Sequence, residues 1–333
     1  MKLNALLKTL GFLALAATPV VAGPSAPVKN PAPLPPPNDD LGITASLGYD
    51  SNYVWRGINY GQHWVRAGLN GALLLVGGAA EDGAGSTSLL WNVDYGSLAG
   101  DHDTFSPNFN GAFGAAAIKS TNSFQRLQLG TAISHDFGPA SVSFGYSFIH
   151  NMGSLANGMG VNQLAGAPGG FGMNDIQQLT LGFSTNLGPI NVSSSANYDL
   201  FNGGWYFDLN AKSTIAVTDA ISIVPHAGLG YGLHYNAGFT QSTRNILGGG
   251  TFGGSNSSTT TNGISGWTAL NVGIDFPIKL NSRATLTPYV AANLPMGPMA
   301  NLARSSSFFT GVGGPSNAFR SICYYGVTLS VRF

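Results

Sequence analysis

Residues 321–333, at the C-terminus of the chain, read SICYYGVTLSVRF. Successive side chains of a β-strand point to opposite faces, so residues two apart share a face. In this stretch one face is apolar and the other is polar or small, which predicts a strand with two different environments. The apolar face holds Cys323, Tyr325, Val327, Leu329, Val331 and Phe333, and the opposite face holds Tyr324, Gly326, Thr328, Ser330 and Arg332.

The same period of two recurs along most of the chain. In residues 138–150, for example, Phe144 and Tyr146 alternate with Ser143 and Ser147. The pattern predicts an all-β chain of about twelve strands, an even number as in single-chain bacterial barrels, with ten or fourteen as alternatives. The predicted strands cover residues 41–53, 63–76, 87–97, 124–137, 138–150, 176–187, 189–200, 205–217, 221–235, 268–277, 284–294 and 321–333.

The composition favours a strand protein with one face in lipid. Charged residues make up 8% of the chain, against about 25% in a soluble globular domain. The chain also has 47 glycines and a mean hydropathy of only +0.12. We therefore expect a transmembrane antiparallel β-barrel, apolar outside and lined by small polar groups inside. A periplasmic β-sandwich is the soluble alternative, although its water-facing strand positions would normally carry more Lys, Glu and Arg.

The N-terminal segments have different compositions. Lys2 and Lys8, the apolar residues 10–17 and a small-residue site ending at Ala22 have the pattern of a secretory signal peptide. Residues 23–38, GPSAPVKNPAPLPPPN, contain seven prolines and favour an extended polyproline II conformation. We expect a signal peptide over 1–22, a proline-rich periplasmic spacer over 23–40 and one barrel domain over 41–333, in the bacterial outer membrane.

The connections between the predicted strands alternate in length. Outer-membrane barrels have short periplasmic turns and longer outer loops, which places Phe333 in the periplasm. Two connections break the alternation, because 77–86 is long for a turn and 201–204 is short for a loop; either indicates a possible miscounted strand. The short turns are 138–139, 188–189, 218–220 and 280–283, and the long loops are 98–123, 150–175, 236–265 and 295–320.

Residues 46–62, SLGYDSNYVWRGINYGQ, resemble the opening of the TorF-type putative porins. In that family an alternating strand runs into a Ser-x-Tyr-x-aromatic-Arg-Gly motif, here Ser51, Tyr53, Trp55, Arg56 and Gly57. The resemblance covers about a tenth of the chain and implies a barrel and a porin, without a substrate. The chain departs from the family in having Asn52 where Asp is more usual, and in its longer loops.

Two roles are open for the motif. Tyr53 and Trp55 suit the headgroup belt of a membrane, where an amphipathic ring contacts both lipid and water. Arg56 is either a structural clasp for the first outer loop or a selectivity group in the lumen. At the other end of the chain, Phe333 closes an alternating strand and resembles the signal read by the barrel-insertion machinery.

The polar faces of the predicted strands define candidates that line the lumen. With Arg332 added and the histidines counted as neutral, these positions have six acids and four bases. The excess of acids predicts passive diffusion of small polar solutes with a weak cation preference. Alternatively, the charges pair with one another and brace the wall. The candidates are Asp50, Arg66, Asp94, Arg126, Asp136, Asp199, Asp208, Lys212, His226, His234 and Asp275.

Other functions receive less support from the sequence. A surface barrel with a plugged lumen is one alternative, and an outer-membrane hydrolase is another. His150 and Ser154 follow one strand, but no motif fixes a Ser, a base and an orienting group, so we expect no enzyme activity. A single cysteine, Cys323, and scattered histidines predict no metal and no cofactor. Fourteen basic and 14 acidic residues give no basic face for nucleic acid. The expected partners are outer-membrane lipid, the insertion machinery and small polar solutes or ions, and the oligomeric state is left open.

Overall fold

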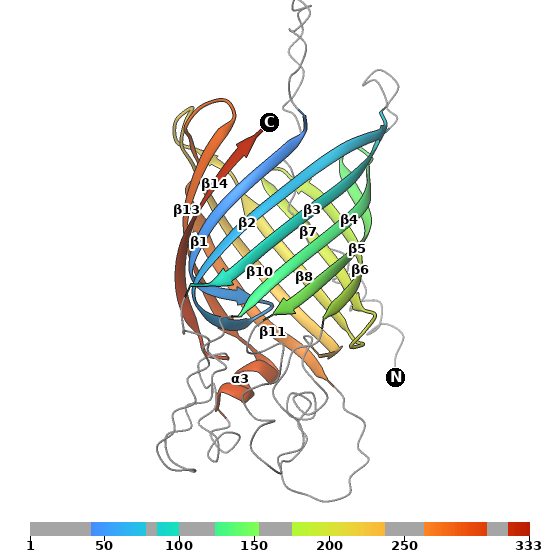
Figure 1. Cartoon of the computed structure of the whole chain (residues 1–333), viewed down its shortest axis with the longest axis vertical. Coiled ribbons are helices and arrows are strands. Elements are labelled where there is room, and N and C mark those ends of the chain that lie inside the picture. The colour runs from blue at the N-terminus through green and yellow to red at the C-terminus, as the bar shows by residue number, and fades with distance from the viewer. Residues whose placement is uncertain (1–40, 78–84, 100–123, 153–174, 237–262, 305–318) are drawn as a thin grey trace, which may run out of the picture.

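The computed structural model describes residues 41–77, 85–99, 124–152, 175–236, 263–304 and 319–333. These ranges form one antiparallel sheet, with a short helix, α3 (Gly297–Arg304), after its penultimate strand (Figure 1). The long strands are β1 (Ile43–Trp55), β2 (Ile58–Val76), β3 (Ser86–Leu98), β4 (Gln125–Asp136), β5 (Ala140–Met152), β6 (Ile176–Leu187), β7 (Ile190–Asp199), β8 (Trp205–Ser213), β10 (Ser222–Tyr235), β11 (Ile264–Asp275), β13 (Ala284–Pro295) and β14 (Ile322–Arg332). Two further strands, β9 (Ile215–Ala216) and β12 (Ile278–Lys279), have two residues each.

The sheet closes on itself. Each long strand pairs with the next long strand along the chain, and β1 pairs with β14 from Thr44↔Arg332 to Asp50↔Gly326. A closed ring leaves no strand edge unpaired, as the hydrocarbon core of a membrane requires. Without the two short strands, the 14-stranded sheet is a barrel of twelve strands. The predicted antiparallel barrel of about twelve strands is therefore confirmed.

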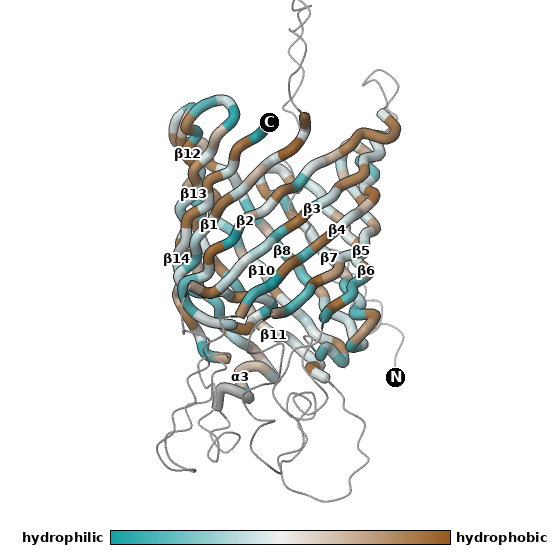
Figure 2. The backbone as a smooth tube through the Cα atoms, in the orientation of Figure 1, coloured by the Kyte–Doolittle hydropathy of each residue, from teal (hydrophilic) through white to brown (hydrophobic). Residues whose placement is uncertain are grey.

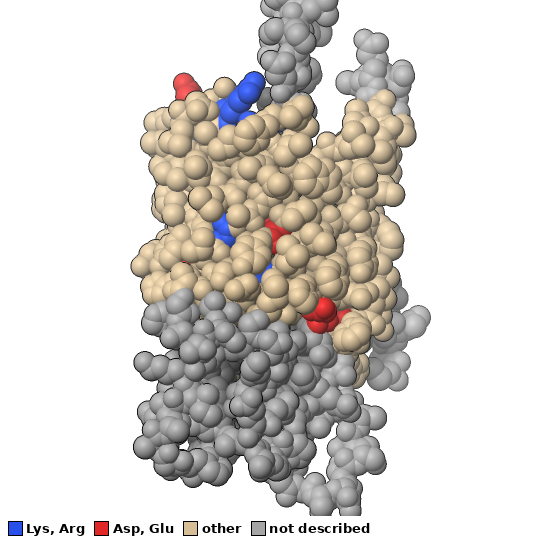
Figure 3. Space-filling view, viewed as in Figure 1, with Lys and Arg blue, Asp and Glu red and all other residues tan. Residues whose placement is uncertain are grey.

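Hydrophobic and hydrophilic residues alternate along the strands (Figure 2), and large apolar side chains are exposed where many polar ones are buried. Ile133, Phe144 and Leu181 are cross-strand neighbours on β4, β5 and β6, and each is more than half exposed on the outside. Ser143, which precedes Phe144 in the sequence, faces inward and is 7% exposed. Charged side chains are sparse on the visible face of the wall (Figure 3). A continuous exposed apolar band of this kind is the lipid-facing surface of a transmembrane barrel.

The two ends of the barrel differ in their connections. The four predicted tight turns all lie at one end, called here the short-turn end, where Gly138 and Gly188 adopt positive φ values of 92° and 62°. The backbone N–H of Phe333 donates to the Ile43 carbonyl at 2.9 Å, so both ends of the barrel sequence meet there. The opposite end is called the long-loop end, and α3 lies there against β11 (Figure 1).

Both irregular connections are real features of the ring. Residues 77–85 join the neighbouring strands β2 and β3 at the short-turn end, and residues 200–204 join β7 and β8 at the long-loop end. The strand count of twelve was therefore right. The start of the second strand was predicted five residues late, at 63, because bulges near residues 53–63 interrupt the alternation.

Two predicted segments cannot be compared with the structure. The signal peptide over 1–22 and the proline-rich spacer over 23–40 lie outside the described residues. In the ranges that are described, no helix has both the length and the apolar character needed to cross a membrane.

Replacing outward Phe144 with Arg tests the assignment of the two faces. Phe144→Arg should lower the free energy of unfolding in lipid by about 2–4 kcal/mol near the midplane, because the charge enters hydrocarbon. Ser141, which faces inward on the same strand and contacts Ser184, supplies the matched variant Ser141→Arg. Urea-induced unfolding in vesicles, followed by the heat-dependent gel shift, measures both changes. Equal losses for the two variants would contradict the assigned faces.

Candidate functional site in the lumen

The tip of the β1–β2 hairpin, residues 53–64, folds into the barrel lumen at the long-loop end and is called here the inward hairpin (Figure 1). The pairing of β1 with β14 ends at Asp50, and a β-bulge follows between Tyr53 and Val54. Arg56 and His63 adopt positive φ values of 51° and 58°. A strand that has left its neighbour and carries a bulge can bend away from the wall.

The turn at the tip contacts β13 and β11, which follow β14 around the ring from β1. Asn293 of β13 donates from Nδ2 to the Gly57 carbonyl at 3.1 Å. Gly57 has a φ of 84°, and a Cβ added to it would lie 2.7 Å from the Ala269 side chain on β11. Glycine is needed here for both reasons, since other residues disfavour this φ and would collide with β11. The tip therefore packs closely against β11 and β13.

Arg56 holds the tip through three other strands. Its Nη1 donates to the Tyr235 hydroxyl of β10 at 2.8 Å, and its Nη2 donates to Gln178 Oε1 of β6 at 3.2 Å. Its guanidinium also lies over the rings of Trp55, Tyr206 of β8 and Tyr235, between 4.4 and 5.1 Å from their centroids. These contacts agree with a structural clasp, one of the two roles predicted for this residue.

A second arginine, Arg126 of β4, also contacts the hairpin and its aromatic rings. Its Nε donates to Asn151 Oδ1 at 2.8 Å, and its Nη1 donates to the Tyr53 hydroxyl at 2.7 Å. Its guanidinium lies 4.3 Å from the centroid of Trp55 and near the rings of Tyr60 and Phe124. The side chain is 4% exposed, so a candidate for the pore lining is buried under the hairpin.

A cluster of aromatic and aliphatic side chains surrounds the hairpin. Tyr53 stacks on Trp64 with centroids 4.1 Å apart, and Tyr60 stacks on Phe124 at 5.3 Å. The buried members are Ile58, Tyr60, Trp64, Leu98, Phe124, Tyr206, Tyr235, Ile264, Met299 and Phe319, with Tyr53 and Trp55 packed against them. The cluster narrows the lumen at the long-loop end. The predicted headgroup belt was wrong for Tyr53 and Trp55, because the hairpin that carries them folds inward and packs their rings against this cluster.

The lumen wall beside the hairpin carries a charged network. Asp50 is 6% exposed; its carboxylate accepts from Arg66 Nε at 3.0 Å and from the Tyr289 hydroxyl at 2.6 Å. Arg66 also donates from Nη2 to Thr328 Oγ1 at 2.8 Å. These bonds join β1, β2, β13 and β14, so the network braces the closure of the ring.

Three other candidate residues lie together on β8, β10 and β11. His226 Nδ1 lies 3.3 Å from Asp275 Oδ2, and Lys212 is opposite His226 in the strand register and exposed. On β3, Asp94 accepts from Asn92 Nδ2 at 2.5 Å and is exposed. These residues remain candidates for the wall of a wet lumen.

Some candidate acids have structural roles. Asp208 accepts hydrogen bonds from Asn197 Nδ2 at 3.2 Å and Ser195 Oγ at 3.5 Å on neighbouring β7. Asp199 is 1% exposed and accepts from the backbone N–H groups of Phe201 and Asn202, which shapes the tight turn between β7 and β8.

Two candidates lie away from the lumen wall. Asp136 is exposed at the short-turn end, where it accepts from the Gly138 N–H at 2.7 Å and caps a turn. His234 has a φ of 53° and is exposed, because a register shift between Gly232 and Tyr235 gives the inward position to Tyr235. Strict alternation predicted the wrong face for His234 because it ignored this bulge.

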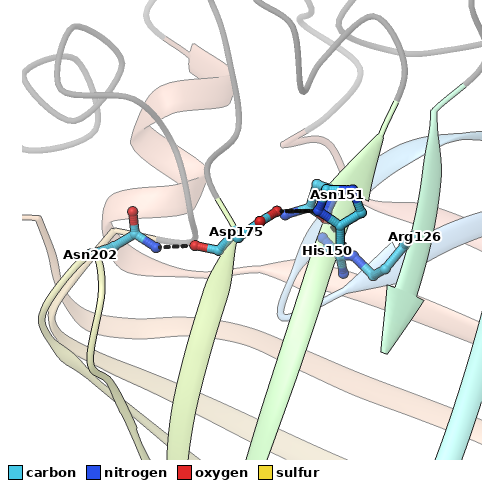
Figure 4. Close-up of polar contacts among 5 residues, drawn as sticks. All are labelled: Arg126, His150, Asn151, Asp175 and Asn202. Carbon is cyan, nitrogen blue, oxygen red and sulfur yellow. Dashed lines mark hydrogen bonds and ion pairs between the residues drawn. The ribbon is translucent and has the colours of Figure 1, made fainter. Parts of the chain in front are cut away.

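A polar network lies at the long-loop rim (Figure 4). His150 Nδ1 lies 2.8 Å from Asp175 Oδ1, and the Asn151 N–H donates to the same oxygen at 3.3 Å. Asn202 donates from Nδ2 to the Asp175 carbonyl at 3.0 Å. The network ties the ends of β5, β6 and β7 together. Ser154, which the sequence places after His150, lies outside the described residues.

The residues that hold the hairpin could not be identified from the alternation pattern. Gln178 and Tyr235 contact Arg56 from 122 and 179 positions away in the chain. Tyr206 and Asn293 could be placed on or near predicted strands, but alternation does not say which strand a bent hairpin meets. Only the closed ring brings these four side chains together around the tip.

The fold and the lumen define a transmembrane β-barrel with an inward hairpin. No family model and no curated protein matches the chain. The resemblance to the TorF-type putative porins therefore remains a hypothesis.

Solved structures with a similar barrel are known. They include the KdgM porin (9% identity, TM-score 0.40, 87% of this chain and 99% of that chain), the translocator domain of autotransporter NalP from Neisseria meningitidis (10%, 0.39, 89% and 90%) and outer membrane phospholipase A from Escherichia coli (11%, 0.35, 88% and 97%). Their functions differ, so the function of this chain has to be argued from its own residues.

Loosening the hairpin should widen the lumen. Arg56→Ala removes two hydrogen bonds and three ring contacts, so we expect larger and noisier single-channel current steps than in the unchanged protein. Arg283→Ala, in an exposed turn at the short-turn end, is the matched control and should leave the currents unchanged.

Gly57→Ala should also give larger and noisier current steps. The added Cβ would collide with Ala269 and push the hairpin away from β11. If both hairpin variants fold, as shown by the heat-dependent gel shift, and conduct like the Arg283 variant, the hairpin does not control the lumen.

Proposed function

We propose that this protein is a porin-like channel of the bacterial outer membrane for the passive diffusion of small polar solutes. The observation that carries the proposal is a closed ring of twelve long strands, apolar outside and polar inside. In this assignment the short-turn end faces the periplasm and the long-loop end faces outward.

The width of the ring supports a pore. Eight strands enclose an interior that side chains fill, whereas sixteen or more leave an aqueous channel. Twelve strands lie between, and many inward positions hold small residues such as Ser193, Ser195, Gly228 and Gly230. The inward hairpin then occupies much of the space at the long-loop end. We infer a narrow path whose tightest part lies beside the hairpin.

The test is single-channel recording of the folded protein in a planar bilayer. We expect discrete current steps, smaller than those of wide general porins, because the hairpin leaves little free cross-section. A folded protein that gives no current at any voltage, with Arg56→Ala equally silent, would contradict the channel.

A surface barrel with a closed lumen is the second candidate function. The fully buried side chains of Ile58 and Tyr60 favour it, because they leave no water around that part of the hairpin. Silence of the unchanged protein together with current from Arg56→Ala would support this candidate, since the hairpin would then be a permanent plug.

We propose a transport role and no enzyme activity. The pair of His150 and Asp175 would supply a base and its orienting group in a hydrolase. Release of fatty acid from phospholipid vesicles by the folded protein, lost in His150→Ala, would overturn this part of the proposal.

A further inference from the structure

The inward hairpin brings two arginines together without a carboxylate partner. In the part of the chain that the structure describes, the ion pairs are Arg66–Asp50, His150–Asp175 and His226–Asp275, and neither Arg56 nor Arg126 belongs to one. The Asp208 carboxylate, which accepts hydrogen bonds from Ser195 and Asn197, acts on Arg56 electrostatically without contacting it and offsets part of the charge of one arginine. A buried charge is costly unless it is paired, so two such cations need explanation.

The two guanidinium groups share one aromatic ring. The central carbon of Arg56 lies 4.6 Å from the Trp55 centroid, and that of Arg126 lies 4.3 Å from it. The two cations are therefore close enough to repel each other in a site with little water. Contact with an aromatic face stabilises each cation by about 0.5–2 kcal/mol, which does not replace a counter-ion.

Two residues around Arg56 carry buried hydrogen-bond donors. Gln178 Nε2 has no acceptor, while its Oε1 accepts from Arg56. Arg126 donates from Nε to Asn151 and from Nη1 to Tyr53, it also interacts with the Tyr60 hydroxyl, and its Nη2 has no further acceptor. A buried donor without an acceptor costs about 1–3 kcal/mol. Arginine donors match the oxygens of carboxylates and phosphates, which accept hydrogen bonds and carry the opposite charge.

We infer that the inward hairpin forms a binding site for a small oxyanion, with Arg56, Arg126 and Gln178 as its ligands. The site has the two features an oxyanion needs, an excess of positive charge and donors that lack acceptors. The inference rests on the proposed channel in one respect: in a conducting barrel the site lies at the tightest part of the path. The channel then favours anions, the opposite of the cation preference that the excess of acids along the strands predicts.

The site is tested first without any current. Inorganic phosphate, added at constant ionic strength, should raise the unfolding temperature of the folded protein in detergent, because a ligand that binds only the folded state stabilises it. Gln178→Glu supplies an internal carboxylate beside Arg56 and should abolish that rise. Asn210→Asp makes the same amide-to-acid change on the inner face of β8 and should keep it.

A second pair of variants removes positive charge. Arg126→Gln should also abolish the stabilisation by phosphate, whereas Lys212→Gln, an exposed lumen cation at the other end of β8, should preserve it. The heat-dependent gel shift shows which variants fold. If Arg126→Gln fails to fold, Gln178→Glu still tests the site. Equal stabilisation of all four variants by phosphate, or no stabilisation of the unchanged protein, would overturn the site.

Reversal potentials in a potassium chloride gradient then separate the site from the channel. We expect the reversal potential of the unchanged protein to indicate preference for anions. In Gln178→Glu and Arg126→Gln it should shift toward the value for cation preference, by several times the shift in the two controls. Stabilisation by phosphate without any current would keep the site and overturn the proposed channel. Current with a cation-favouring potential and no effect of phosphate would keep the channel and overturn the site.

Discussion

The structure depends on one constraint, which is that every backbone N–H and C=O inside a bilayer needs a partner within the protein. The pairing of β1 with β14 meets it by closing the ring. That pairing stops at Asp50, and the chain beyond it is free to leave the wall. The strand that closes the barrel therefore also carries the hairpin that narrows it, and the Asp50–Arg66–Tyr289 network strengthens the ring at this junction.

The lumen contains two kinds of charged residue. Along the wall, Asp50 and Asp275 lie against the basic side chains of Arg66 and His226, and Asp208 accepts a hydrogen bond from Asn197. Around the hairpin, Arg56 and Arg126 are held by rings and amides instead. A count of charges over the whole lumen therefore says little about the ion that passes, because charges at the narrowest point act at short range and with little screening.

The candidate site was predictable only in part. The motif from Ser51 to Gly57 stood out in the sequence, and a clasp was among the roles predicted for Arg56. The positions of Tyr53 and Trp55 were not predictable, because the hairpin that carries them leaves the wall. The position of His234 was not predictable, because a single-residue bulge changes which face a side chain occupies. Asp136 and Asp199 follow the alternation, yet they lie next to turns, where backbone N–H groups compete for their carboxylates.

The sequence by itself determined the class of fold. Alternation over twelve segments, low charge and turns such as Gly188–Pro189 each follow from local rules of side-chain direction, solvation and turn geometry. The tertiary structure alone decided what fills the lumen. Gln178, Tyr206, Tyr235 and Asn293 meet the hairpin only because the ring closes and the hairpin bends into it. Contacts between residues so far apart in the chain are set by the geometry of the whole ring, which no local pattern records.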